Sequence, residues 1–448
     1  MSKYKEMIRK TPGDTEWFVH DRFGMFIHFG LYAMPARHEW VKKTEEIEEE
    51  KYQKYFDYFN PDMLDPREWA RQAKNAGMKY AVITTKHHEG FCLFDSKYTD
   101  YKITNTKYGK DLIKEYVEAF RAEGIRVGFY YSLIDWNHKD FPIDRKHPRR
   151  NDPMAEEMDK GRDVKKYAEY MRNQVTELLT NYGKIDILWF DFSYSSKCGD
   201  DRGDNTHEWM QNNGCKGKEQ WESEKLIETC RSLQPWLIIN NRCELDQDIW
   251  TPEQYQCTEW PTHPDTGELV TWETCQTFSG SWGYYRDEHS WKSPKTLIDL
   301  LVNTVSLGGN LIMNIGPTSR GYIDKRAEKA LEIYGNWMKY NCRSIYGCTK
   351  ADPEFVAPLG TRLTQSEDGK RLYIHLVEYP TTRYLTMKSL AGKIDYAQFL
   401  HDGSEILYRE GSDGIVRVGM DDSSDVVVFS MPVLNTDIID PVIEVFLK

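Results

Sequence analysis

The stretch DILWFD, residues 186–191, joins an apolar run to a terminal carboxylate. A run this short and this apolar is typical of a parallel strand that is covered on both faces. Similar runs recur between about residue 22 and residue 345, at intervals that leave room for a helix after each. They are GMFIHF at 24–29, YAVITT at 80–85, RVGFYYS at 126–132, LIINNR at 237–242 and NLIMNI at 310–315, with weaker candidates QYQCTEW at 254–260 and WETCQTF at 272–278.

Helical patterns fill the segments between these runs. Asp65 and Pro66 mark one helix start, as an N-cap and a first helical residue. Eight strand candidates that alternate with helices favour a (β/α)₈ barrel over an open doubly wound sheet, and no GxGxxG follows a strand. The predicted helices are at 65–77, around 113–120, at 159–182, at 220–233, from Ser293-Pro294 onward and at 325–342.

The pattern changes after about residue 350. Short strand-like pieces such as RLYIHLVEY and DVVVFSM alternate with Asp-Gly, Gly-Ser and Pro turns, which indicates an antiparallel β-sandwich. We therefore predict two domains, a (β/α)₈ barrel over residues 1–350 and a β-sandwich over residues 351–448.

Composition narrows the classes of partner. The chain has 448 residues and a formal net charge of −12, so it lacks the basic surface that nucleic acid or an anionic membrane would attract. No apolar run approaches the length needed to span a bilayer. Aromatic residues make up 13% of the chain, which suits a neutral ligand with an apolar face as well as an ordinary core.

The cysteines predict reduced thiols. They number nine, an odd count, and no CxxC spacing occurs, so neither a disulfide framework nor a zinc cage is expected. The segment MSKYKEMIRKTPGD at the start is polar and has no apolar core of a signal peptide. A cytoplasmic location is the expectation.

Carboxylates near predicted strand ends are the sharpest candidates for chemistry. Asp191 closes an apolar strand, where a carboxylate is costly unless it has a partner or faces an open site; capping of the next loop is the alternative. Such a group can attack an anomeric carbon while a second carboxyl about 5–5.5 Å away protonates the leaving oxygen. From position alone, the second carboxyl stays open among Glu253, Glu259 and Glu273.

Histidines at strand ends raise a metal-dependent alternative. His28, His87 and His88 could bind a metal, but adjacent residues of a strand point to opposite faces and no HxH pair ends the first strand. Neutral histidines that donate hydrogen bonds to sugar hydroxyls fit better. The Gly308-Gly309 pair lacks the GK[ST] of a phosphate loop and predicts a tight helix-to-strand turn. We expect no metal and no cofactor.

Several blocks together carry a family resemblance. They resemble the family 29 glycoside hydrolases, the α-L-fucosidases, in order over about residues 10–350. This resemblance implies a (β/α)₈ barrel followed by a β-sandwich, and a retaining double-displacement hydrolysis of terminal α-L-fucosyl residues on an oligosaccharide or glycoconjugate. The blocks are WFVHDRFGMFIHFGLYAMPARHEW, AVITTKHHEGFCLFDS, GFYYSLIDW, DILWFDFSY, WETCQTFSGSWGYYRDE and LVNTVSLGGNLIMNIGPTSRG.

The same resemblance implies roles for single residues. Asp191 matches the nucleophile, and Glu253 matches the acid/base, with Glu273 as its rival. The tyrosine contact falls on Tyr131 rather than Tyr130, and the paired histidines imply a turn that lets both reach the site. The implied substrate contacts are His28, Glu39, Trp40, His87, His88, Tyr131, Trp189 and Arg242.

Three other functions compete with this interpretation. A relative with shifted glycone specificity, such as an α-L-galactosidase, would differ in the apolar patch that receives the C6 methyl group, for which Phe29, Phe190 and Phe192 are candidates. A carbohydrate-binding pseudoenzyme would not need both Asp191 and Glu253. A metal-dependent barrel hydrolase would lose activity in chelator. A homo-oligomer also stays open.

Overall fold

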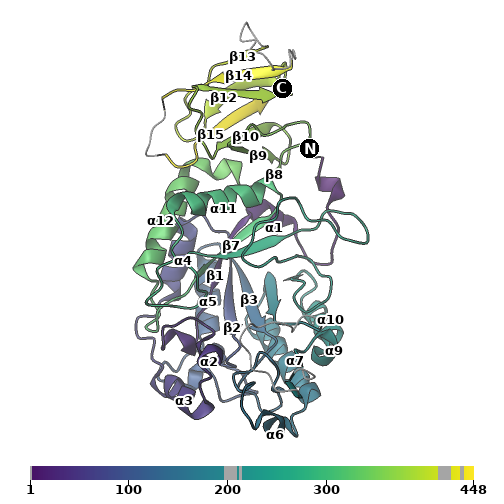
Figure 1. The fold of residues 1–448 in the computed structure, drawn as a ribbon, viewed down its shortest axis with the longest axis vertical. Helices are drawn as coiled ribbons and strands as arrows, with labels where there is room; N and C mark the ends of the chain where they lie inside the picture. Colours follow the sequence, from purple (N-terminus) through teal and green to yellow (C-terminus); the bar gives the residue numbers. More distant parts are fainter. Residues whose placement is uncertain (1–2, 196–208, 211–213, 412–424, 434–437) are drawn as a thin grey trace.

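The computed structural model describes residues 3–195, 209–210, 214–411, 425–433 and 438–448. Its first part is built around a parallel sheet of seven strands with helices outside, and its last part is antiparallel (Figure 1). The parallel strands pair in the order β5-β4-β3-β2-β1-β7-β6. They are β1 (Phe23–Ile27), β2 (Tyr80–Lys86), β3 (Arg126–Ser132), β4 (Ile187–Asp191), β5 (Ile238–Ile239), β6 (Glu273–Thr277) and β7 (Asn310–Ile315).

Residues 249–250 connect the two edges of this sheet. Ile249 makes a parallel bridge to Asn240 beyond β5, and Trp250 makes one to Trp272 beside β6. The ring is therefore closed, as the predicted (β/α)₈ barrel requires. The strand predicted at 254–260 is wrong: this segment is a loop with an exposed Tyr255, and the two residues that complete the ring lie just before it.

The principal helices agree with the sequence patterns. Asp65 caps α4 by accepting from the Arg67 N–H, and Ser293 caps α11 by accepting from the Thr296 N–H. The helix predicted from 159 begins later, because Asp163 caps it at Val164. The α-helices are α1 (Glu16–Asp21), α2 (Val41–Thr44), α3 (Glu49–Tyr58), α4 (Pro66–Asn75), α5 (Leu112–Ala122), α6 (Ala155–Asp159), α7 (Val164–Asn181), α9 (Lys218–Trp221), α10 (Ser223–Leu233), α11 (Pro294–Ser306) and α12 (Lys325–Asn341), and short 3-10 helices are η1 (Lys5–Met7), η2 (Leu31–Ala33), η3 (Ile103–Asn105) and η4 (Cys342–Ser344).

The C-terminal part is the predicted antiparallel sandwich, stacked on α11 and α12 in Figure 1. Its two sheets share one apolar core, to which Leu372 and Ile374 contribute from one sheet and Val427 and Phe429 from the other. One sheet has the order β12-β15-β10-β9-β8 and the other β11-β14-β13. The strands are β8 (Cys348–Lys350), β9 (Thr361–Ser366), β10 (Arg371–Leu376), β11 (Tyr384–Lys388), β12 (Ile394–Phe399), β13 (Tyr408–Glu410), β14 (Val426–Ser430) and β15 (Val442–Leu447).

The strand β8 already pairs with β9 of the sandwich, although it precedes residue 351. The division into residues 1–350 and 351–448 stays a prediction.

The cysteines differ from expectation at one position. Cys215 is disulfide-bonded. The expectation of nine reduced thiols is therefore wrong, because an odd count does not prevent one pair from forming. The free cysteines of the described chain are Cys92, Cys230, Cys243, Cys257, Cys275, Cys342 and Cys348. Among the helices that the structure describes, none has the length and apolarity that a membrane crossing demands.

Gly308 and Gly309 make the turn from α11 into β7, as expected. Gly308 has a φ of 75°, and a Cβ on it would lie 2.3 Å from the Trp260 ring. A Cβ on Gly309 would lie 2.4 Å from the Trp272 ring. Two tryptophans thus occupy the space that larger side chains would need.

Substitution of Gly308 by alanine is expected to lower the free energy of unfolding by ~3 kcal/mol, from left-handed strain and overpacking together. Gly267 is the matched control, since its φ is 70° but nothing lies within 4 Å of the position that a Cβ would take there. Gly267→Ala should cost only ~1–2 kcal/mol. Urea unfolding of both variants measures the difference, and equal losses would mean that the Trp260 contact contributes nothing.

Candidate active site

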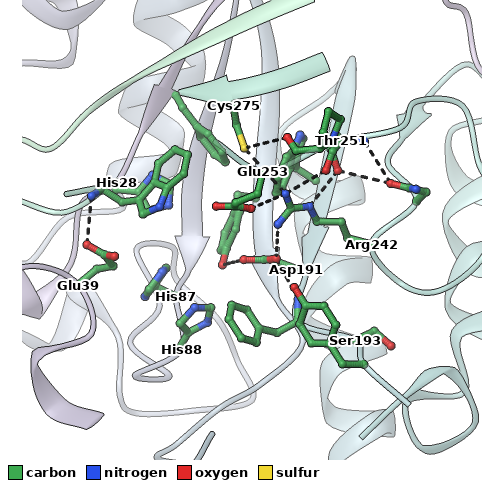
Figure 2. A pocket seen from close by; sticks show the side chains of 18 of the residues that line it. His28, Glu39, His87, His88, Asp191, Ser193, Arg242, Thr251, Glu253 and Cys275 are labelled. Atoms are coloured by element: carbon green, nitrogen blue, oxygen red, sulfur yellow. Dashed lines mark hydrogen bonds and ion pairs between the residues drawn. The ribbon is translucent and has the colours of Figure 1, made fainter. Parts of the chain in front are cut away.

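A cavity of about 710 Å³ opens at the C-terminal ends of the parallel strands (Figure 2). None of the described sandwich residues lines it. Its walls come from strand ends and from the loops that follow them. The lining residues are Phe26, His28, Glu39, Trp40, His87, His88, Tyr130, Trp189, Asp191, Phe192, Ser193, Tyr194, Asn241, Arg242, Glu244, Thr251, Pro252, Glu253, Tyr255, Cys275 and Trp282.

Asp191 is the last residue of β4 and lies at the bottom of this cavity. Its Oδ1 accepts from Arg242 Nη1 at 3.0 Å and from the Phe192 N–H at 3.0 Å. Its Oδ2 accepts from the Tyr130 hydroxyl at 2.9 Å. Phe192 has a φ of 73°, so the chain turns sharply just after the carboxylate. Burial raises the pKa of Asp191, although the Arg242 guanidinium opposes the increase.

Arg242 lies between two carboxylates, as Figure 2 shows. Its Nη2 donates to Glu253 Oε2 at 2.5 Å, while its Nη1 holds Asp191. Burial lowers the pKa of Arg242, but Glu253 and Asp191 outweigh it, and the pKa stays above its ordinary value. Asp191 and Glu253 are therefore held within the reach of one guanidinium, a compact arrangement of two carboxyl groups.

Glu253 and Glu273 occupy different places. The Glu253 side chain is 50% exposed at the cavity wall. Glu273 is the first residue of β6, fully buried and outside the lining, where it accepts from Tyr80 at 2.5 Å and from Trp189 Nε1 at 3.1 Å. Burial raises the pKa of Glu273 to about 7. Glu259 is exposed and does not line the cavity.

The three predicted histidines meet in the cavity. The chain turns directly after β2, where the Gly90 N–H donates to the His87 carbonyl at 3.0 Å, and the ring centroids of His87 and His88 are 3.9 Å apart. His28 lies beside them, 5.6 Å from His87 between ring centroids. Burial lowers the pKa of His28 to about 3 and that of both neighbours well below the ordinary value. These rings are therefore neutral at physiological pH.

The tautomers of two histidines follow from their partners. The Asn314 amide nitrogen donates to the Trp282 carbonyl at 2.7 Å, so its oxygen accepts from His28 Nδ1 at 2.6 Å. The Ser132 hydroxyl donates to the Ile134 carbonyl at 2.8 Å, so its oxygen accepts from His88 Nδ1 at 2.8 Å. In both neutral rings Nε2 is then an acceptor, suited to a hydroxyl donor.

The pH dependence of stability should report these buried histidines. Because the pKa of His28 falls from 6.5 to about 3 on folding, the unfolded chain binds a proton that the folded chain refuses, and stability is lost as pH falls below about 6.5. The substitution His28→Asn should reduce the slope of unfolding free energy against pH by about 1.4 kcal/mol per pH unit between about pH 6 and 4.

A lining residue that does not titrate gives the control for this prediction. Trp282→Phe should shift the whole curve without changing its slope. Glu89 and Glu273, with pKa values raised to about 7 by burial, act in the opposite direction, but they are common to all three proteins and cancel. Parallel curves for the wild type and His28→Asn would contradict the assignment.

Two further predicted contacts, Glu39 and Trp40, also line the cavity. Glu39 is buried and accepts from the Trp282 and Gly283 N–H groups at 3.2 and 2.9 Å. Trp40 packs on His88 with ring centroids 4.7 Å apart. The Arg242 guanidinium lies 4.5 Å over the Trp189 ring, in cation–π geometry.

The structure places Tyr130 at the cavity in place of the predicted contact Tyr131. Tyr131 is fully buried outside the cavity, where its hydroxyl donates to Gln174 of α7 at 2.7 Å. Successive residues of a strand point to opposite faces, so only one of the two can face the barrel interior. Among the apolar candidates, Phe192 lines the cavity together with Phe26, whereas Phe29 and Phe190 do not.

A matched pair of substitutions tests the two tyrosines. Tyr130→Phe removes a hydrogen bond that lowers the pKa of Asp191, so the acidic limb of the kcat/KM profile should move to higher pH, with kcat/KM reduced about tenfold. Tyr131→Phe should leave the profile in place and lower only the unfolding free energy. Similar profiles for the two variants would place neither hydroxyl at the reacting group.

Several residues that line the cavity could not be predicted from the sequence. Tyr194, Glu244, Tyr255 and Cys275 are of this kind, and Trp282 stands out only as one of several tryptophans beside polar residues. Tyr194 and Glu244 come from the loops after β4 and β5, and no local motif separates them from ordinary loop residues. No group of three or more His, Cys, Asp or Glu residues arranged to hold a metal ion occurs within the described ranges.

A closed parallel barrel, with two carboxylates joined by one arginine over a pocket of neutral histidines and aromatic rings, defines a glycoside hydrolase. The sequence model described as alpha-L-fucosidase matches residues 2–343. This chain belongs to the α-L-fucosidase family, family 29 of the glycoside hydrolases, and is a retaining α-L-fucosidase.

Solved structures and curated relatives agree with this placement. Alpha-L-fucosidase isoenzyme 1 from Paenibacillus thiaminolyticus is 42% identical, with a TM-score of 0.86 over 97% of this chain and 99% of that chain. A trapped covalent intermediate of a Bacteroides thetaiotaomicron enzyme is 27% identical, with a TM-score of 0.79 over 100% and 99% of the two chains. Tissue alpha-L-fucosidase of Bos taurus is 28% identical in an alignment of 399 positions that covers 83% of this chain and 77% of that protein.

Proposed function

We propose that the enzyme removes terminal α-L-fucosyl residues from fucosylated oligosaccharides or glycoconjugates, with Asp191 as nucleophile and Glu253 as acid/base. The observation that carries this assignment is the shared guanidinium of Arg242, which holds both carboxylates at one cavity. The buried Asp191 suits attack at an anomeric carbon, and the half-exposed Glu253 suits exchange of protons with a leaving group and then with water.

The first step forms a covalent intermediate. An Asp191 oxygen attacks the anomeric carbon as the glycosidic C–O bond breaks, and Glu253 gives its proton to the leaving oxygen. In the second step, Glu253 takes a proton from water, the water oxygen attacks the anomeric carbon, and the bond to Asp191 breaks. Two inversions return L-fucose with its original α configuration.

The hydrogen bonds favour this division of roles. Asp191 accepts from three donors, the Arg242 guanidinium, the Tyr130 hydroxyl and a backbone N–H, which stabilise its ionised form. One guanidinium balances one negative charge, so a proton on the other carboxyl leaves the cluster neutral. Glu253 has fewer donors in the described structure and is half-exposed, so we assign the proton-transfer role to it.

The pocket suits an uncharged deoxy sugar. The Nε2 atoms of His28 and His88 accept from hydroxyl groups, and Glu39 accepts as well. Phe26 and Phe192 supply an apolar patch for the C6 methyl group. An α-L-galactoside would place a hydroxyl there, and desolvation of that hydroxyl without a partner would weaken its binding.

Release of 4-nitrophenol from 4-nitrophenyl α-L-fucoside, followed by NMR of the first sugar formed, tests this function. The expected result is α-L-fucose as the first product, slower turnover of the α-L-galactoside, and equal rates with and without EDTA. First appearance of β-L-fucose would contradict retention. Loss of activity in EDTA would indicate a metal-dependent reaction.

The remaining expectations concern location and assembly. A cytoplasmic location stays a prediction, and the disulfide of Cys215 counts against it, because disulfides persist mainly in oxidising compartments. Measurement of the molar mass in solution would decide between a monomer and a homo-oligomer.

A further inference from the structure

The mouth of the cavity differs from its bottom. The bottom is lined by buried groups, among them His28, His87, Asp191 and Trp189. The mouth carries large aromatic side chains that the core does not cover, and Tyr255 is the most exposed of them at 62%. The exposed Tyr255 ring beside Glu253 contributes little to the core, so a role in ligand binding would explain its position.

Tyr255 is held in place although it is exposed. Its N–H donates to the Glu253 carbonyl at 2.7 Å. The Thr274 hydroxyl of β6 lies 3.2 Å from the Tyr255 carbonyl and 3.4 Å from the Glu253 carbonyl, so one strand residue anchors both ends of this turn. The backbone that carries the phenol ring is thus fixed two residues from the proposed acid, at the wall of the cavity.

A second aromatic wall comes from the loop after β4. Phe192 and Tyr194 meet edge to face, with ring centroids 5.4 Å apart and an interplanar angle of 82°. Glu244 anchors this wall by accepting from the Ser193 hydroxyl at 2.9 Å, the Ser195 N–H at 2.8 Å and the Lys218 N–H at 2.9 Å. Its lone pairs are used within the protein, so the aromatic rings are the groups left to contact a ligand.

The charge of the lining limits what this mouth accepts. Among the described residues, four carboxyl side chains line the cavity, those of Glu39, Asp191, Glu244 and Glu253, against one guanidinium and no lysine. An anionic leaving group would meet repulsion there. A neutral pyranose would instead stack its C–H face on an aromatic ring.

We infer that the mouth of the cavity is a subsite for a neutral leaving sugar, with Tyr255 as its specificity-determining residue. The inference rests on the proposed function, since the leaving group is defined by Asp191 and Glu253. It extends that function from the fucosyl unit to the sugar on the other side of the cleaved bond. Sulfated or otherwise acidic sugars are disfavoured at this position.

The test compares two substrates that share the fucosyl unit. An α-L-fucosyl-galactose disaccharide fills the subsite, whereas the fluoride of α-L-fucosyl fluoride is too small to reach Tyr255. Tyr255→Ala should lower kcat/KM for the disaccharide by ~3- to 10-fold, on the scale of one aromatic contact, and leave that for the fluoride unchanged. Tyr255→Phe should retain both values. Tyr58→Ala, at another tyrosine that is 68% exposed, is the surface control and should change neither.

Each outcome separates the subsite from the chemistry. Equal effects of Tyr255→Ala on both substrates, or none on either, would overturn the subsite while the fluoride still reports an active fucosidase. A wild type that turns over neither substrate would overturn the proposed function itself. A disaccharide with 6-O-sulfated galactose should be cleaved more slowly than its neutral counterpart, and the difference should shrink in high salt. An equal or faster rate would overturn the preference for a neutral sugar.

Discussion

Asp191→Ala should lower kcat for 4-nitrophenyl α-L-fucoside by ~10⁴-fold or more, the scale seen when a catalytic nucleophile is removed. The carboxylate is buried at the cavity bottom, held by Arg242 and Tyr130, and no other carboxylate of the lining occupies that position. The fold should survive, because the change removes a buried charge whose pKa burial already raises. Thermal unfolding of the variant checks this point.

Azide added to the Asp191→Ala variant provides the decisive control. The small anion can enter the space vacated by the carboxylate and attack the anomeric carbon from the same side, which yields β-L-fucosyl azide. Asp191→Asn is the matched variant, since its amide fills that space and should prevent rescue. The α azide from Asp191→Ala, or turnover close to that of the wild type, would show that Asp191 is not the nucleophile.

The sequence predicted most of the barrel, because its strands are short apolar runs whose ends are marked by polar residues. The candidate at 310–315 has the bounds of β7, and the candidate at 186–191 begins one residue before β4. The element at 249–250 could not be found in this way. It contributes two residues and isolated bridges, too few for a periodic pattern, and the ring closes through tertiary contacts.

The candidate site shows the same division between local and tertiary information. Side chains alternate between the two faces of a strand, so either Tyr130 or Tyr131 faces the barrel interior. The sequence motif alone does not say which of these two neighbours it is. The chain turns after Lys86, and this turn brings His87 and His88 to one cavity. In the sequence only Gly90 indicates it, and in the structure this glycine has a φ of 82°. Glu244 could not be identified, because its role follows from loops that meet only in the folded chain.

Replacement of the acid/base should divide substrates by their leaving groups. Glu253→Ala is expected to lower kcat/KM by ~10²–10⁴-fold for a fucosyl disaccharide, whose leaving oxygen needs a proton. For α-L-fucosyl fluoride, whose leaving group needs little assistance, bond cleavage should stay fast and hydrolysis of the intermediate should become rate-limiting. Azide should then accelerate turnover and give α-L-fucosyl azide, since it attacks the intermediate from the side that Glu253 leaves open.

Glu273→Gln is the matched test of the rival assignment. Its carboxyl is buried away from the cavity and holds Tyr80 and Trp189, so loss of those contacts should lower the unfolding free energy by ~1–3 kcal/mol. Any loss of activity should be similar for the disaccharide and the fluoride, because it acts through Trp189 and the Arg242 guanidinium that lies over its ring. If instead Glu273→Ala yields the α azide and Glu253→Ala does not, the acid/base must reach the substrate from β6. The barrel interior would then have to open in a way that the buried Tyr80–Glu273–Trp189 contacts oppose.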